Sequence, residues 1–153
     1  MPAISNIELY EQPDKHILSV RTTLSFDQYP NTAKLAFDSI QEYLSKNHIL
    51  PAGEPFVCYH NTDLKNLDVE LGIPVSRPAT DCDSIKAGII PAHKSVSALS
   101  LGAYEQTDSL LYEMLDWISI HGYKQTGGIY HIYLNKDDRR QEELLTRIVI
   151  PVT

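Results

Sequence analysis

The feature that most constrains the fold of this chain is an internal repeat. Two stretches, QPDKHILSVRTTLSFDQ (residues 12–28) and IPAHKSVSALSLGAYEQ (residues 90–106), align without a gap. Two later stretches, NLDVELGIPV (residues 66–75) and ELLTRIVIPV (residues 143–152), share the same ending. Self-similarity of this length indicates that one structural pattern is used twice, so the repeat predicts two halves of similar construction.

Each half reads as strands around one helix. The aligned stretches alternate apolar and polar positions before their helix starts, which is typical of a strand. Residues 32–47 and 107–122 then place apolar side chains at helical spacing and are predicted to be amphipathic helices. NIELYE and SIKAGI are expected to form a leading strand in each half. Further strand-like runs lie at residues 56–61 and 66–75 in the first half and at residues 130–135 and 144–152 in the second.

These elements predict an α+β fold of two pseudo-symmetric strand-helix-strand-strand repeats, whose curved antiparallel sheets pack as one domain over residues 1–153. We expect repeat one at about residues 4–75, a linker at about 76–83 and repeat two at about 84–153. Neither half is long enough to cover both faces of its sheet. A cleft between the repeats is therefore the expected ligand site.

Composition argues against several classes of protein. The net charge of −7, with no Lys/Arg block at either end, argues against nucleic acid as a direct partner. No segment approaches the roughly 18 consecutive apolar residues of a membrane span, and the N-terminus lacks a signal-peptide pattern. We therefore expect a cytoplasmic protein with no membrane partner. The cysteines, Cys58 and Cys82, form neither a disulfide framework nor a zinc spacing, and no metal or cofactor is expected.

The second half carries a resemblance to a known family. The LGAYEQ helix start, LDWISIHGY at the end of the second helix, and YHIYLN followed by LLTRIVIPV resemble the GyrI-like domain. This is the AraC-type effector-binding domain, which includes the BmrR-like multidrug-sensing domains of transcription regulators. The resemblance covers nearly the whole chain, and no DNA-binding helix-turn-helix precedes it, so we expect a stand-alone member. It implies a small-molecule cleft between the repeats, lined by aromatic and often acidic residues that receive cationic, planar drugs.

This chain departs from the family pattern at the acidic positions. Where the penultimate strand usually reads Tyr-Glu-x-Tyr, the tyrosines match and His131 replaces the glutamate. Where the last strand usually reads Thr-Glu-x-Tyr-x-Pro-Val, Arg147 replaces the glutamate and Val149 the tyrosine. An acid remains only in the first repeat, at Glu70, which precedes its proline by the same spacing.

We expect the ligand site to draw residues from both repeats, because equivalent strands would line one cleft. Aromatic side chains with a few polar groups among them suit a flat ligand. Cys58 and His60 alternate with Tyr59 along one strand, so we expect them to face the helix and the core instead. No residue is assigned a catalytic role. The expected ligand-binding residues are Val57, Tyr59, Glu70, Tyr104, Trp117, His131, Tyr133, Arg147 and Val149.

Arg147 decides the expected charge of the ligand. A buried carboxylate favours a cation, and an always-charged guanidinium inverts that preference. Either Arg147 pairs with Glu70 and leaves a near-neutral aromatic pocket, or it is free to bind a carboxylate or phosphate; partial burial favours the pair. An imidazole at His131 beside Arg147 would resist protonation and could act as a neutral donor or base, although a histidine on a sheet face is more often structural.

The sequence thus predicts binding of a small aromatic xenobiotic or effector, neutral or anionic, for sensing or sequestration. Two alternatives come from the resemblance. One is a protein-interaction module that modulates DNA gyrase, and the other is a hydrolase of reactive cyclopropane-type xenobiotics. The missing second-repeat glutamate argues against an enzyme, because His131 or Glu70 would have to supply the acid or base. DNA gyrase or a separate regulator remains open as a macromolecular partner.

Overall fold

The computed structural model describes residues 3–103, 107–135 and 138–153, and it divides into two compact units. Unit 1 comprises Met1–Gln12 and His93–Thr153, and unit 2 comprises Pro13–Ala92. The helices and strands of unit 2 are β2 (Lys15–Leu24), α1 (Tyr29–Lys46), β3 (Phe56–Tyr59), β4 (Leu67–Pro74) and β5 (Lys86–Ile90). Those of unit 1 are β1 (Glu8–Gln12), β6 (His93–Leu101), α2 (Thr107–Ile120), β7 (Ile129–Tyr133) and β8 (Leu145–Val152). The predicted α+β class, with one helix and antiparallel strands in each copy, is confirmed.

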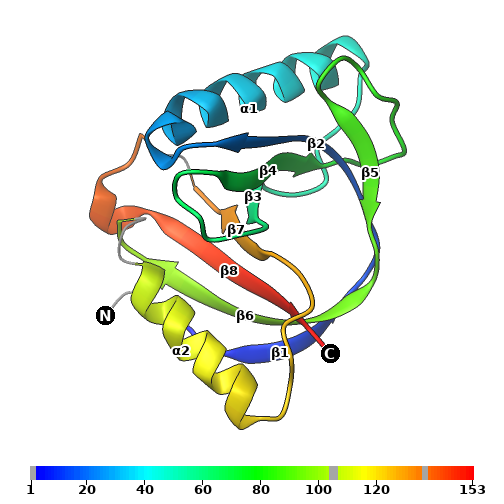
Figure 1. The fold of residues 1–153 in the computed structure, drawn as a ribbon. Coiled ribbons are helices and arrows are strands. Elements are labelled where there is room, and N and C mark those ends of the chain that lie inside the picture. The colour runs from blue at the N-terminus through cyan, green and yellow to red at the C-terminus, as the bar shows by residue number, and fades with distance from the viewer. Residues whose placement is uncertain (1–2, 104–106, 136–137) are drawn as a thin grey trace. The chain divides into compact units, whose positions relative to one another are not determined.

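Unit 2 is an antiparallel sheet with one helix on one face. Its strands are hydrogen-bonded in the order β3-β4-β2-β5, and α1 lies along this sheet (Figure 1). The helix buries Ala36, Ile40 and Leu44, which are spaced four residues apart and so share one side of the helix. Ile40 and Leu44 pack with Leu18 of β2 and Ile73 of β4 in one core cluster. Each such side chain contributes about 1.5–3 kcal/mol by leaving water.

Unit 1 repeats this construction. Its strands are ordered β1-β6-β8-β7, with α2 alongside (Figure 1). The buried residues of α2 include Leu110, Met114 and Ile118, again at intervals of four, and they pack against β6 and β8. The helix is followed by Gly122 at φ 78°, in the left-handed region that glycine adopts without a steric penalty. Gly122 therefore ends the second helix with a glycine cap.

The two leading strands are exchanged between the copies. β1 precedes repeat one in the chain but pairs with β6 of unit 1, while β5 pairs with β2 of unit 2. The connections from β1 to β2 and from β5 to β6 are two residues long and begin with Pro13 and Pro91. A tight two-residue hairpin needs a positive φ at its first loop position, which proline cannot adopt. Each leading strand therefore cannot fold back on its neighbour and pairs elsewhere.

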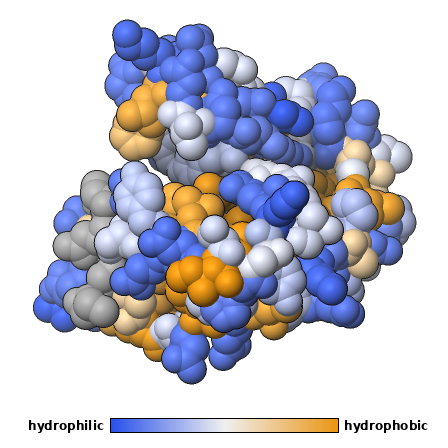
Figure 2. Space-filling model, turned by 60° about the horizontal axis from the view of Figure 1, so that its bottom comes forward, coloured by the Kyte–Doolittle hydropathy of each residue, from blue (hydrophilic) through white to orange (hydrophobic). Residues whose placement is uncertain are grey.

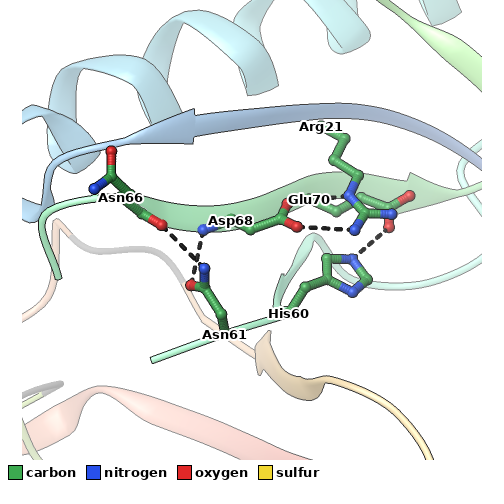
Figure 3. Close-up of polar contacts among 6 residues, drawn as sticks. All are labelled: Arg21, His60, Asn61, Asn66, Asp68 and Glu70. Carbon is green, nitrogen blue, oxygen red and sulfur yellow. Dashed lines mark hydrogen bonds and ion pairs between the residues drawn. The ribbon is translucent and has the colours of Figure 1, made fainter. Parts of the chain in front are cut away.

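An asparagine closes the hairpin between the last two strands of each copy. In unit 2, Asn61 Nδ2 donates to Asn66 O at 3.0 Å, and Asn61 Oδ1 accepts from Asp68 N at 2.9 Å (Figure 3). In unit 1, Asn135 makes the same pair of contacts, with Glu143 O at 2.7 Å and Leu145 N at 3.0 Å. Each asparagine follows a tyrosine by two residues, Tyr59 and Tyr133, so this sequence match between the copies marks one local structure used twice.

Gly72 of β4 lies close to a phenyl ring and to a backbone carbonyl. A Cβ added there would lie 2.6 Å from Phe56 Cζ and 2.9 Å from Leu18 O. We expect Gly72→Ala to lower the free energy of unfolding by about 1–3 kcal/mol, because a rigid ring and a backbone carbonyl must both move. Gly88→Ala is the matched control, since nothing lies within 4 Å of a Cβ there. Urea unfolding of both variants checks this, and equal losses would contradict it.

Most of the surface in the view of Figure 2 is hydrophilic, as expected for a chain with a net charge of −7. Hydrophobic residues gather near the centre of that view, where polar side chains interrupt them. Exposed apolar residues of unit 1 include Ile4, Leu9 and Ile120. Among the described residues, no helix has the length and apolar character that crossing a membrane requires.

Candidate functional site

Glu70 is held by two side chains on the sheet face opposite α1. Ser19 Oγ donates to Glu70 Oε2 at 2.7 Å, and His60 Nε2 lies 3.1 Å from Glu70 Oε1 (Figure 3 shows the contact with His60). Ser19 lies on β2, and His60 directly follows β3, so three chain segments converge on this carboxylate. The Glu70 and His60 side chains are only 21% and 24% exposed. Both carboxylate oxygens of Glu70 therefore have partners within unit 2.

Arg21 is the cross-strand partner of Glu70, but its side chain binds Asp68, two residues away from Glu70 on β4. Arg21 Nε and Nη2 donate to the two oxygens of Asp68 at 3.0 and 2.9 Å (Figure 3). This two-point hydrogen bond lowers the pKa of Asp68 and raises the pKa of Arg21. The nearest guanidinium is thus committed to Asp68, and Glu70 relies on Ser19 and His60.

Arg147 occupies the equivalent place in unit 1. It is partly buried on the sheet face opposite α2, and its Nη1 donates to Ser97 Oγ at 3.2 Å. Within unit 1, no carboxylate of the described residues forms an ion pair with it. Tyr10 lies on the same face: burial raises its pKa, and the positive charge of Arg147 lowers it by a smaller amount.

The two serines are equivalent positions of the repeat. Ser19 and Ser97 fall at the same place in the gapless alignment, and each contacts the charged residue of its own unit. A hydroxyl donates to the Glu70 carboxylate in one copy and accepts from the Arg147 guanidinium in the other, because a hydroxyl can do both. One scaffold therefore accommodates opposite charges.

The predicted site residues divide between the two faces of each sheet. In unit 2, Val57 and Tyr59 pair with Leu71 and Val69, on the α1 side, opposite to Glu70. In unit 1, His131 and Tyr133 pair with Ile148 and Thr146, on the α2 side, while Arg147 and Val149 lie on the other face. The expectation that His131 lies beside Arg147 is therefore wrong. Alternation along each strand does place His131 with Tyr133, and Arg147 with Val149.

His131 resists protonation for a different reason from the one expected. Burial lowers its pKa to about 4. Its cross-strand neighbour Ile148 belongs to the core cluster under α2. A neutral imidazole at this position is therefore a consequence of desolvation.

Trp117 is on α2 and stacks on aromatic neighbours of its own unit. Its ring lies 3.9 Å from that of His121 and 6.2 Å from that of Tyr123, with nearly parallel planes in both cases. It also packs against the core cluster under α2. Trp117 is thus on the helix side of unit 1, with His131 and Tyr133.

Three other expectations concern residues near these faces. Tyr104 lies outside the described residues. Cys58 pairs with Glu70 across β3 and β4, so Cys58 faces away from α1 and the expectation that it faces the helix with His60 is wrong. Among the described residues, no group of three His, Cys, Asp or Glu side chains is placed to hold a metal ion.

Sequence reasoning missed the residues that position the two charges. Ser19 and Ser97 could have been found, because they are identical in the aligned copies. His60 could not, since its contact with Glu70 depends on the register between β3 and β4. Tyr10 could not either, because β1 reaches unit 1 only through the exchange of leading strands.

Comparison with known proteins places this geometry in context. No curated protein matches the chain. Among solved structures, the EcmrR C-terminal domain is 22% identical, with a TM-score of 0.87 over 98% of each chain. EcmrR in a complex with DNA is 24% identical, with a TM-score of 0.84, and the match covers 96% of this chain but only 57% of that one. This chain therefore spans little more than half the length of that EcmrR chain.

More distant structures share the fold. A hydrolase from Listeria innocua is 16% identical, with a TM-score of 0.72 over 97% of this chain and 92% of that one. SAV2435 bound to tetraphenylphosphonium is 14% identical, with a TM-score of 0.61 over 97% of this chain and 94% of that one. The family model of the GyrI-like small molecule binding domain matches residues 5–153. Because this match spans nearly the whole sequence, the chain belongs to the GyrI-like small molecule binding domain family.

Proposed function

We propose that this chain binds a small aromatic molecule that is neutral or anionic, and that it serves to sense or sequester that molecule. The observation that carries the proposal is the environment of Arg147. Its guanidinium is partly buried, contacts the neutral Ser97, and has no carboxylate partner among the described residues of unit 1.

A partly buried guanidinium favours an anionic partner. Arginine remains charged at any physiological pH, and removing it from water without compensation costs free energy. A carboxylate on the ligand would recover that cost through charge-assisted hydrogen bonds, which are roughly twice as strong as neutral ones. A cation at the same place would add repulsion to the desolvation cost.

The engagement of Glu70 supports the same charge preference. Its two oxygens already interact with Ser19 and His60. A cationic ligand would have to compete with these contacts for the carboxylate. In unit 2, then, Glu70 has side-chain partners, whereas Arg147 has no carboxylate partner among the described residues of unit 1.

The solved relatives support the binding role but differ in what they bind. SAV2435 was solved with tetraphenylphosphonium, a cation, and it shares 14% of its sequence with this chain. EcmrR was solved with DNA, and this chain spans 57% of its length. Sensing on behalf of a transcription regulator is the role that the likeness to the EcmrR C-terminal domain favours.

Two ions of nearly the same shape and opposite charge test the proposal. Tetraphenylphosphonium and tetraphenylborate differ mainly in the sign of their charge. We expect titration calorimetry to show that the borate binds at least about 10-fold more tightly, because the Arg147 guanidinium attracts the anion and repels the cation, and two unit charges roughly 6 Å apart interact by about 3 kcal/mol at an effective dielectric constant of about 20. Tighter binding of the phosphonium would overturn the proposed charge preference.

The two alternatives have less support. Hydrolysis needs an acid or base that reaches the substrate, whereas both oxygens of Glu70 already contact Ser19 and His60, and His131 is on the α2 face, where its low pKa follows from burial. The likeness to the Listeria innocua hydrolase, at 16% identity, concerns the fold. Modulation of gyrase would use surface residues rather than Arg147.

A further inference from the structure

Buried hydroxyls follow β6 along the face that carries Arg147. Ser95 and Ser97 alternate with Val96, which belongs to the core cluster under α2, so both serines face away from the helix. Ser95 is 0% exposed and Ser97 is 5% exposed. Tyr10 of β1 and Pro151 of β8 are the cross-strand neighbours of Ser95.

Ser97 and Tyr10, which neighbour Ser95 on this face, have hydrogen-bond partners, but the Ser95 hydroxyl does not. Ser97 Oγ accepts from Arg147 at 3.2 Å. Tyr10 Oη donates to Gln12 Oε1 at 2.9 Å. Among the residues that the structure describes, Ser95 Oγ has no hydrogen-bond partner. A buried hydroxyl left unpaired destabilises the fold, so a group that enters from this face is the natural partner.

The spacing of these groups indicates the shape of such a partner. Side chains two residues apart on one face of a strand are separated by roughly 6.6 Å. The Ser97 hydroxyl marks the position of the Arg147 guanidinium, and Ser95 is one such step further along β6. The length of a benzene ring that carries polar groups at its two opposite ends is close to this separation.

We propose that Arg147 and Ser95 form the two ends of a subsite for an aromatic acid that carries a hydroxyl group opposite its carboxylate. Arg147 binds the carboxylate, and Ser95 binds the hydroxyl. The aromatic ring spans the distance between them, next to Val149, the cross-strand neighbour of Ser97 on the same face. This inference rests on the proposed preference for anionic aromatic ligands and narrows it to one class.

The test compares three acids of closely similar size by titration calorimetry: 4-hydroxybenzoate, 4-methylbenzoate and benzoate. We expect 4-hydroxybenzoate to bind about 3- to 10-fold more tightly than 4-methylbenzoate, which is the usual contribution of one neutral hydrogen bond. Ser95→Ala is expected to abolish this difference and to leave the affinity for benzoate unchanged. Ser119→Ala, on the exposed surface of α2, is the matched control and should change neither value.

Thermal unfolding of the ligand-free variants separates binding from a structural role. Because Ser95 Oγ is unpaired, Ser95→Ala should keep or raise the melting temperature. A fall of several degrees would mean that an internal water already satisfies the hydroxyl, and this would overturn the subsite. Equal binding of the three acids, with all of them tighter than neutral benzamide, would overturn the subsite and leave the proposed charge preference standing. Tighter binding of benzamide than of benzoate would overturn both.

Discussion

Replacing Arg147 with glutamate is expected to reverse the charge preference of the ligand site. The wild-type chain should bind tetraphenylborate more tightly than tetraphenylphosphonium, and Arg147→Glu should bind the phosphonium more tightly. Reversing the charge of residue 147 turns its attraction for one ion into a repulsion and its repulsion of the other ion into an attraction, and each such charge–charge interaction is worth about 1.5–3 kcal/mol in a partly buried site. We therefore expect the ratio of the two dissociation constants to change by at least about 100-fold, measured by titration calorimetry.

The repeat itself indicates that this variant will fold. In unit 2, Ser19 donates to a carboxylate at the position equivalent to Arg147. Ser97 can rotate its hydroxyl and donate to the new carboxylate in the same way. The fold already contains both versions of this contact, so the free energy of unfolding should change little.

Two control variants separate the effect of a charge at position 147 from the effect of the net charge of the protein. Arg140→Gln removes a positive charge from unit 1 at an exposed arginine that interacts with Glu142 and Glu143, and it should leave the ratio unchanged. Arg147→Gln should give an intermediate ratio, because it removes the charge without reversing it. An unchanged ratio in Arg147→Glu would show that the ligand binds away from this residue.

The fold was largely predictable because each element has a local cause. Alternation predicted the strands, and the spacing of Ile40 and Leu44 and of Met114 and Ile118 predicted the helices that cover them. The exchange of leading strands was not predicted. Its cause is local too, since Pro13 opens the connection to β2 in a conformation that no tight hairpin can use. Which strand then accepts β1 depends on contacts distant in the sequence.

The candidate site was less predictable, because alternation along one strand does not fix the face that the next strand presents. Period two correctly pairs His131 with Tyr133 and Arg147 with Val149. Whether the two pairs share a face depends on the register between β7 and β8, where His131 stands opposite Ile148. A register changed by one residue would have placed all four together. For the same reason, the sequence could not show that Tyr59 and Glu70 lie on opposite faces of their sheet.

The sequence also could not show which side chain each charged residue pairs with. Arg21, His60 and Ser19 could each have paired with Glu70. The structure assigns Arg21 to Asp68, since the two-point contact satisfies both carboxylate oxygens, and leaves Glu70 to the serine and the histidine. Such choices follow from side-chain geometry across β2, β3 and β4.

Lowering the pH is expected to destabilise the protein through His131. Burial lowers its pKa from 6.5 to about 4 in the folded state. Between these values the unfolded chain binds a proton that the folded chain does not, so stability is fully present above about pH 6.5 and falls as the pH drops toward 4. This group alone should contribute a loss of about 3 kcal/mol over that interval, since each pH unit corresponds to about 1.4 kcal/mol. Urea unfolding at pH 7.5, 5.5 and 4.5 measures it.

The comparison with His131→Gln separates this group from the others that titrate in the same range. Glutamine keeps a polar side chain with hydrogen-bonding capacity but cannot be protonated. The variant should lose less stability on acidification than the wild type, by about 2–3 kcal/mol at pH 4.5. His48→Asn is the control, because His48 is exposed at φ 55°, a conformation that asparagine tolerates, and its slope should match the wild type. If the His131→Gln slope also matched the wild type, the imidazole would have to be solvated in the folded protein, and desolvation against the α2 face would no longer explain its neutrality.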